Sequence, residues 1–238
     1  MRTKTKKATA AAIAGGLVMC LVVAFAGLFA VNTLLDSEKT DRFAVTEPVQ
    51  KLVVAADAGD VKVVATDADR VTVRRTTHWV TSEPKATKTV SGSVLRLADN
   101  CDGWTTFRCE TSYQIEVPRG LTVDVKVDSG DVDVRGVTGA VNLSSDSGDV
   151  SGHGLAGPRV RATSDSGDVR LGLVSSPSSV EALSDSGDVD VELPRGEYAL
   201  DTHTDSGDTS VHDIVRYDLA DHAVKARSDS GDVTVGAH

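Results

Sequence analysis

One tetrapeptide carries many of the acidic side chains that could do chemistry in this 238-residue chain. Asp-Ser-Gly-Asp occurs six times, at intervals of 18, 19, 20, 20 and 24 residues. The copies begin at Asp128, Asp146, Asp165, Asp185, Asp205 and Asp229. Carboxylates repeated in this way suit two chemistries, which are oxygen ligation of a cation and acid–base catalysis by a carboxylate pair.

The second aspartate of each copy is the candidate cation ligand. These residues are Asp131, Asp149, Asp168, Asp188, Asp208 and Asp232. If the copies stack as β-strands, equivalent carboxylates lie ~4.8 Å apart and repel by ~0.9 kcal/mol even in bulk water. Extracellular Ca²⁺ would relieve this repulsion. The nine-residue calcium repeat and the twelve-residue EF-hand loop are both absent from the sequence. We therefore expect weak Ca²⁺ binding at most, and no other cofactor.

A structural role for the tetrapeptide is the simpler interpretation. Asp and Ser side chains accept hydrogen bonds from nearby backbone N–H groups, and glycine adopts a positive φ without steric cost. The tetrapeptide then forms a corner in every repeat. The corner glycines are Gly130, Gly148, Gly167, Gly187, Gly207 and Gly231.

Catalysis is the less favoured interpretation of the same residues. An aspartic-protease dyad needs two carboxylates at one site, which six copies do not explain. The sequence also lacks a Ser-His-Asp order, a nucleophile elbow, a phosphate-binding loop and a zinc-protease motif. We expect no enzymatic activity, with an enzyme acting on envelope glycans as the remaining alternative.

Period-2 alternation of apolar residues surrounds each corner. Val123, Val125 and Val127 precede the first copy, and Val132 and Val134 follow it. This pattern is typical of half-buried strands. Stacking each unit on its predecessor would bury a column of Val, Ala and Ser. We therefore predict an all-β fold, a parallel, right-handed β-solenoid over residues 121–238, with a β-sandwich as the alternative.

Residues 43–120 are less regular, and we predict that they form a first rung and a cap. Asp57-Ala58-Gly59-Asp60 is a weaker copy of the corner, and the terminal unit of a repeat array must hide one end of the core. Cys101 and Cys109 are the only cysteines after residue 35. Outside the cytoplasm such a pair predicts a disulfide, with a metal site as the alternative.

The N-terminal segment has the pattern of a membrane anchor. Residues 1–9 are short and basic, and residues 10–35 contain no charged side chain. Because basic residues precede the apolar run and acidic ones follow it, we predict a cytoplasmic start, a signal-anchor helix over 10–35 and an extracytoplasmic remainder. A cleavable signal peptide is the alternative. Residues 36–42 would form a linker, and the protein would be a single-pass cell-membrane protein.

The charge balance excludes some partners. After residue 35 the chain has 21 basic and 35 acidic residues, a net charge of −14. Nucleic-acid binders need a basic surface, so we exclude nucleic acid as a partner. The same excess of acid argues against adsorption onto anionic lipid.

Together these pieces resemble a known family. The membrane segment, the Ile115-Glu116-Val117-Pro118 step and the Ser-Gly-Asp copies from Ser129 to Asp232 are similar to a bacterial β-strand-repeat family of unknown function, often tagged "putative adhesin". The resemblance implies a β-solenoid at the cell envelope, without an established activity, catalytic residue or ligand. We expect an outward-facing interaction module that binds an unknown envelope protein or cell-surface polymer. The alternative is an accessory or sensor subunit of a membrane signalling system, acting through a partner protein.

Overall fold

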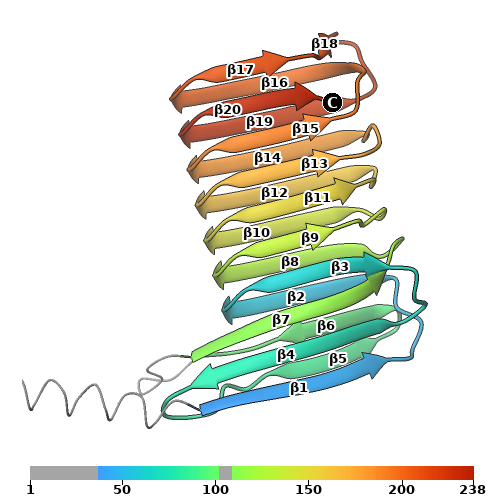
Figure 1. Cartoon of the computed structure of the whole chain (residues 1–238), viewed down its shortest axis with the longest axis vertical. Coiled ribbons are helices and arrows are strands. Elements are labelled where there is room, and N and C mark those ends of the chain that lie inside the picture. Colours follow the sequence, from blue (N-terminus) through green and yellow to red (C-terminus); the bar gives the residue numbers. More distant parts are fainter. Residues whose placement is uncertain (1–36, 102–108) are drawn as a thin grey trace, which may run out of the picture.

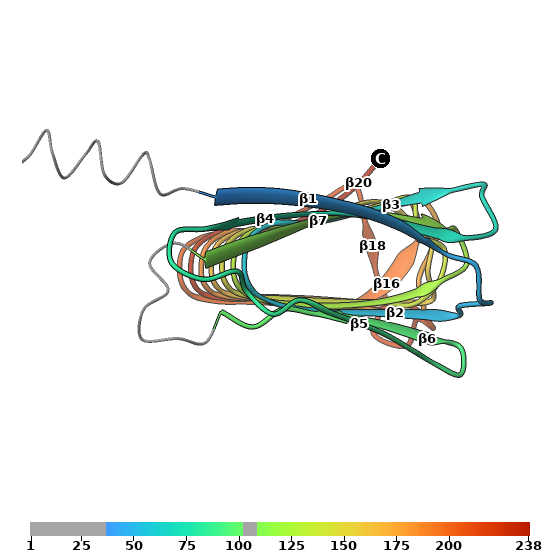
Figure 2. The same cartoon turned by 90° about the horizontal axis from the view of Figure 1, so that it is seen from below.

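The computed structural model describes residues 37–101 and 109–238, and these residues form two facing β-sheets (Figures 1 and 2). The predicted anchor at 10–35 lies outside them. Among the described residues, no helix is long and apolar enough to cross a bilayer. Each sheet has ten strands, which at about 4.8 Å per strand gives a height of about 43 Å.

The first sheet contains the strands that follow the corners and, at its N-terminal end, three further strands. Its strands in spatial order are β1 (Ser37–Val45), β4 (Val71–Trp79), β7 (Cys109–Pro118), β3 (Val61–Thr66), β9 (Val132–Arg135), β11 (Val150–Leu155), β13 (Val169–Leu173), β15 (Val189–Leu193), β20 (Val233–Ala237) and β17 (Thr209–His212).

The second sheet contains the strands that precede the corners, with further short strands at both of its ends. Its order, from the same end of the molecule, is β5 (Thr87–Ser91), β6 (Val94–Ala98), β2 (Lys51–Ala58), β8 (Thr122–Ser129), β10 (Val141–Ser147), β12 (Arg159–Ser166), β14 (Ser179–Ser186), β19 (Ala223–Ser230), β16 (Glu197–Ser206) and β18 (Val215–Arg216).

A second-sheet strand, its corner and the next first-sheet strand form one rung. Neighbouring rungs pair in parallel and in register, so that Val141 of β10 lies between Val123 of β8 and Val160 of β12. Equivalent corners therefore stack on one another at one edge of the molecule (Figure 1). The prediction of an all-β array of parallel strands is confirmed, and stacked parallel rungs of this kind do not fit the alternative β-sandwich.

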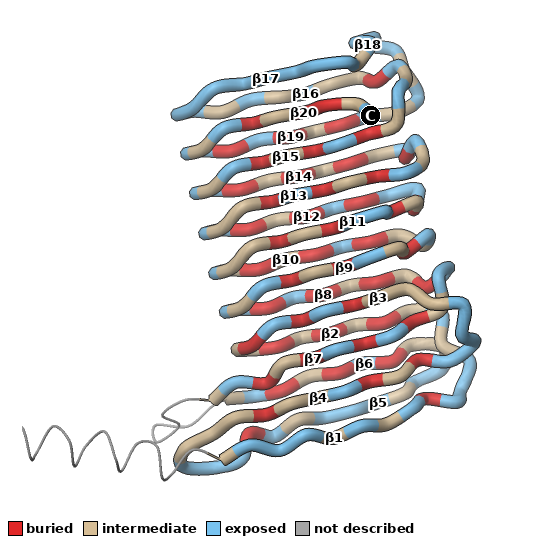
Figure 3. The backbone as a smooth tube through the Cα atoms, viewed as in Figure 1, coloured by how far each residue is buried: buried red, intermediate tan, exposed pale blue. Residues whose placement is uncertain are grey.

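The core between the sheets is thin and rich in valine. Inward residues such as Val125, Val134 and Val191 are completely buried, and they alternate with outward polar ones (Figure 3). Tyr113 and Tyr198 are the largest buried side chains. Small β-branched residues fit because the two sheets face each other directly, without a covering helix.

The stacking order differs from the chain order at the C-terminal end. The last rung, β19–β20, lies between β14–β15 and β16–β17, so the final strands of the chain are internal. The expectation that each unit stacks on its predecessor is therefore wrong here. The longest interval between corners, 24 residues, runs from Asp205 to Asp229. In this interval the chain leaves β17 and turns back to form β19.

The N-terminal end is closed by antiparallel strands. β1 and β7 both pair antiparallel with β4, and β5 pairs antiparallel with β6. Residues 36–42 were expected to be a linker, but β1 begins at Ser37. The sequence of β1 gives little sign of a strand, because most of its side chains are exposed or half-buried and its apolar alternation is weak.

Candidate functional site

The stacked corners form an acidic edge along the molecule, and their geometry depends on glycine. Gly148 has φ +152°, and a Cβ there would lie 2.2 Å from the carbonyl oxygen of Gly130 in the neighbouring rung. The same close approach recurs at Gly187, 2.3 Å from the oxygen of Gly167. The corner glycines therefore serve the backbone conformation and the close stacking of rungs.

The second aspartates of the corners form a hydrogen-bonded ladder. The Asp149 N–H donates to Asp131 Oδ1 at 2.9 Å, and the Asp168 N–H donates to Asp149 Oδ1 at 2.9 Å. In spatial order the ladder aspartates are Asp60, Asp131, Asp149, Asp168, Asp188, Asp232 and Asp208. Every ladder carboxylate except that of Asp208, the last in this order, therefore accepts a hydrogen bond from a backbone N–H of the next rung.

This ladder contains all six predicted calcium ligands. One oxygen of most of these carboxylates is already engaged by a backbone N–H, which also offsets part of the repulsion along the row. Within residues 37–101 and 109–238, there is no cluster of three or more His, Cys, Asp or Glu side chains suited to a metal ion. Weak calcium binding at these residues stays a prediction.

Buried hydroxyl groups join the corners from inside. Ser164 Oγ donates to the carbonyl oxygen of Gly148 at 2.8 Å, and Ser184 Oγ donates to that of Gly167 at 2.9 Å. In the rung β16–β17, Thr204 Oγ1 donates in the same way to the carbonyl oxygen of Gly231. Because Ser164 and Ser184 are buried and each bond joins two neighbouring rungs, these bonds help to fix the spacing of the rungs.

The first aspartates of the corners have no such role. We call Asp128, Asp146, Asp165, Asp185, Asp205 and Asp229 the outer aspartates. Asp165, Asp185 and Asp229 are exposed and make no side-chain hydrogen bond or ion pair with another described residue. Sequence reasoning selected the second aspartates as ligands, but the carboxylates that the fold leaves available are the outer ones. The first and second aspartates recur at the same intervals, so the sequence gives no signal that distinguishes their roles.

Few cations balance this edge. Lys126 Nζ lies 3.6 Å from an oxygen of Asp128 and 3.7 Å from one of Asp146, and Arg170 pairs with Asp149 and Asp168. His203 Nε2 lies 2.8 Å from Asp205 Oδ1. The six tetrapeptides contain twelve carboxylates, so the edge has a large excess of negative charge.

The outer face of the second sheet is balanced by comparison. Its acidic residues lie beside basic ones on adjacent strands, as in the pairs Lys51–Asp124, Lys225–Glu181 and Arg227–Asp201. The negative charge of this face is therefore largely paired, unlike that of the corner edge.

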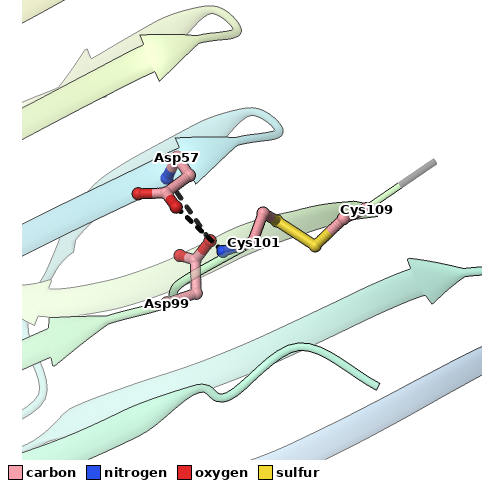
Figure 4. Close-up of a disulfide and its surroundings, with 4 residues drawn as sticks. All are labelled: Asp57, Asp99, Cys101 and Cys109. Carbon is pink, nitrogen blue, oxygen red and sulfur yellow. Dashed lines mark hydrogen bonds between the residues drawn. A yellow bond between two sulfur atoms is a disulfide. The ribbon is translucent and has the colours of Figure 1, made fainter. Parts of the chain in front are cut away.

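A disulfide replaces the tetrapeptide in the rung formed by β6 and β7. Cys101 and Cys109 are bonded, which confirms the predicted pair (Figure 4). The Cys101 N–H donates to Asp57 Oδ2 at 2.8 Å, and the Asp57 N–H donates to Asp99 Oδ2 at 3.4 Å. The rung that carries the disulfide is thus hydrogen-bonded to the first corner, in the neighbouring rung β2–β3.

A buried acid lies beneath this disulfide. Asp99 is 6% exposed, and burial raises its pKa to about 6, although the Asp57 N–H and the hydroxyl of Tyr113 act in the opposite direction. Burial also raises the pKa of Tyr113. By register Asp99 occupies the inward position at which β2 has Ala56, since Ala55 pairs with Ala98. An acid therefore stands where the other rungs place Ala, Val, Ser or Thr.

Comparison with known proteins places the chain in a family. No curated protein matches it. Similar solved structures include a "putative cell adhesion protein" from Clostridium sporogenes, with 9% identity and a TM-score of 0.48, covering 85% of this chain and 100% of the other. A "putative adhesin" from Bacteroides fragilis has 16% identity and a TM-score of 0.48, covering 85% and 97%. A "putative lipid binding protein" from Parabacteroides distasonis has 8% identity and a TM-score of 0.34, again covering 85% and 97%.

The sequence pattern of one family covers most of the chain. It matches residues 49–235, which include the first rung, part of the cap and every tetrapeptide. The function of this family is unknown, as the resemblance seen in the sequence implied. The chain belongs to the Toastrack DUF4097 family.

Proposed function

We propose that this protein is a non-enzymatic interaction module of the cell envelope, which binds its partner through the acidic corner edge. The row of outer aspartates is the observation that carries the proposal. The corner obtains its hydrogen bonds from the ladder aspartates, the glycines and the buried hydroxyls. The outer carboxylates of Asp165, Asp185 and Asp229 are therefore free to contact another molecule.

The energetics of the row favour a cationic partner. Neighbouring outer aspartates repel by ~0.9 kcal/mol per pair in bulk water at the strand spacing, and no structural contact offsets this at Asp165, Asp185 or Asp229. Positive groups of an envelope protein or a cell-surface polymer would relieve the repulsion along the whole row at once. Because the carboxylates are exposed, such binding should weaken as salt concentration rises.

The position of β1 agrees with an anchored, outward-facing molecule. β1 begins directly after the predicted anchor, at the end of the stack opposite β17 (Figure 1). With residues 10–35 in the membrane, the cap would lie next to the bilayer, and the corner edge would lead away from it. In this arrangement every rung is accessible to a partner outside the cytoplasm.

The test removes four outer charges while keeping the ladder. The variant Asp128→Asn, Asp165→Asn, Asp185→Asn, Asp229→Asn is compared with wild type by proximity labelling from the extracytoplasmic part of the chain in living cells. Asparagine preserves shape, so thermal unfolding should be nearly unchanged. The labelled partners should be lost or strongly reduced.

A matched control removes four charges elsewhere. It is Glu38→Gln, Glu47→Gln, Asp69→Asn, Glu116→Gln, all at exposed positions away from the tetrapeptide corners. The control should label the same partners as wild type. Unchanged labelling in both variants would reject the corner edge as the binding surface. A labelled set dominated by a membrane kinase or transporter would favour the accessory or sensor role over adhesion.

A further inference from the structure

The C-terminal end of the stack carries a second surface with features of a binding site. Its terminal rung is β16–β17, and β17 is exposed along its whole length (Figure 3). β18 covers only Glu197 and Tyr198 of β16. The rest of β16 and all of β17 form the last strands of their sheets, with one edge unpaired.

The free backbone groups of β16 can be identified from its pairing. The Ala199 N–H donates to the carbonyl oxygen of His222, the residue before β19, whereas the Tyr198 carbonyl oxygen accepts from the Tyr217 N–H on the other side. Backbone groups of successive residues in a parallel strand point to alternate sides. Leu200, Thr202 and Thr204 therefore direct their N–H and C=O groups to the open edge.

Apolar side chains gather beside this edge. Of the five large hydrophobic residues exposed in the described part of the chain, four lie within residues 211–219. They are Val211, Val215, Tyr217 and Leu219. Val211 is 39% exposed, although Val191 and Val235, its counterparts in the next rungs, are fully buried.

One alternative explanation is that the end of the stack is polar only because it faces solvent, and this accounts for part of the pattern. Thr202 and Thr209 replace the Ala and Val that occupy equivalent inward positions in β19 and β20, and a terminal repeat needs such polarity for solubility. Acidic residues also protect an open edge from aggregation. Neither reason accounts for Tyr217, or for Leu219 at 80% exposure.

The acidic charge of this end of the stack indicates which kind of partner would bind to the edge. Residues 197–222 contain seven acidic residues and one arginine. A second copy docking by the same end would bring two acidic surfaces together. A second copy docking through β1 would offer an edge with balanced charge, where Lys39 pairs with Glu83 and Asp41 with Arg75. A basic segment from another protein fits better.

We propose that the open edge of β16 and β17 binds an extended segment of a partner protein, with alternating basic and apolar residues, as an added strand. Backbone hydrogen bonds would supply affinity, and the acidic and apolar side chains would supply selectivity. This site goes beyond the proposed function, because it requires none of the four outer aspartates altered in the test above.

The probe is a ten-residue peptide of alternating Lys and Val, titrated into the full-length chain and followed by fluorescence anisotropy. A Glu–Val peptide of the same length is its reversed-charge control. Thr202→Pro removes a free N–H from the open edge without breaking the β16–β19 pairing. It should weaken binding of the Lys–Val peptide at least tenfold. Thr202→Val, which keeps the N–H but loses the hydroxyl, should stay within twofold of wild type.

A second variant keeps the test decisive if the proline disturbs the rung. Asp218→Lys, Asp221→Lys reverses two exposed charges at the same end. It should weaken the Lys–Val peptide about tenfold and strengthen the Glu–Val peptide. Equal binding of both peptides to all variants, or no binding to wild type, would overturn the proposal.

The same assay separates this proposal from the proposed function. The outer-aspartate variant, Asp128→Asn, Asp165→Asn, Asp185→Asn, Asp229→Asn, should bind the Lys–Val peptide like wild type. Loss of peptide binding in that variant would place the peptide on the corner edge and reject the open-edge site. Self-association of the full-length chain that the peptide does not inhibit would identify a second copy as the occupant, and would also reject it.

Discussion

The two ends of the stack solve the same problem differently. At the N-terminal end, antiparallel strands, a disulfide and the ion pairs Lys39–Glu83 and Arg75–Asp41 close the core. At the C-terminal end, the chain turns back and inserts its last rung beneath β16–β17, whose edge stays open. The comparison indicates that one end is built for closure and the other can accept an addition.

The largest difference between the ends should appear at the corner glycines. Gly59→Ala places a Cβ 2.6 Å from the carbonyl group of Thr111 at φ +116°, inside the closed end. We expect a loss of about 4 kcal/mol or more in the free energy of unfolding. Gly207→Ala creates a similar overlap with Gly231, but the terminal rung can open locally, so the loss should be about 1–2 kcal/mol.

Urea unfolding and native-state hydrogen exchange measure this contrast. Gly172→Ala is the control, because φ is not in the left-handed region and the nearest atom is 3.9 Å from the added Cβ. It should change stability by less than about 0.5 kcal/mol. Equal losses at Gly59 and Gly207 would show that the terminal rung cannot open by itself.

The buried Asp99 should give the closed end a pH dependence. Its folded pKa of about 6 is above its value of 3.8 in the absence of burial. Between these values the folded state keeps a proton that the unfolded state releases, so stability falls as pH rises from about 4 to about 6. Asp99→Asn should remove this fall, gaining about 3 kcal/mol at pH 7.5 and almost nothing at pH 3.5.

Denaturant unfolding at several pH values tests the assignment to Asp99. Glu110→Gln, an exposed acid at the same end, should leave the pH profile unchanged. A wild-type profile that is flat between pH 4 and pH 6 would be incompatible with a raised pKa at Asp99.

Reduction of the disulfide should loosen the closed end only. The bond joins residues separated by eight positions, and in the chain-entropy account a loop of this size contributes about 2.5 kcal/mol. Reductant should lower the melting temperature of wild type. Hydrogen exchange should rise in β6 and β7 and stay unchanged in β16 and β17. The variant Cys101→Ser, Cys109→Ser should melt at the temperature of reduced wild type and should not respond to reductant.

The smallest contrast concerns two equivalent valines. Val191→Ala removes fully buried methyl groups and should cost about 2 kcal/mol. Val211→Ala, at 39% exposure in the terminal rung, should cost well under 1 kcal/mol. Chemical denaturation of the two variants gives the difference directly, and similar costs would mean that Val211 is covered in solution.

The repeating part of the fold could be predicted from the sequence because its causes are local. Alternation such as Val123, Val125, Val127 marks strands, and the recurring tetrapeptide marks the corners. The stacking order could not be predicted in the same way. Each rung presents nearly the same Val-rich inner face and the same corner, so β14–β15 can accept either of the following rungs. The 24-residue interval and Thr209, in place of Val, were the available signals.

The site was harder to predict than the fold for a related reason. Both aspartates of the tetrapeptide are acidic and close to glycine, and only the three-dimensional stacking shows that Asp149 accepts a backbone N–H while Asp165 has no such contact. β1 was missed because a strand that pairs at the end of a sheet needs little apolar alternation. Residues whose role depends on the next rung are not revealed by their own neighbours in sequence.

The internal position of β19 and β20 has a consequence for synthesis. As the chain leaves the ribosome, the rungs from β8 to β15 can assemble in the order of their translation. β16 and β17 emerge before β19 and β20, the strands with which they pair in the folded molecule, so they cannot yet form their native pairing. The core is complete only when β19 and β20 arrive, and a chain that ends before β19 lacks an interior layer.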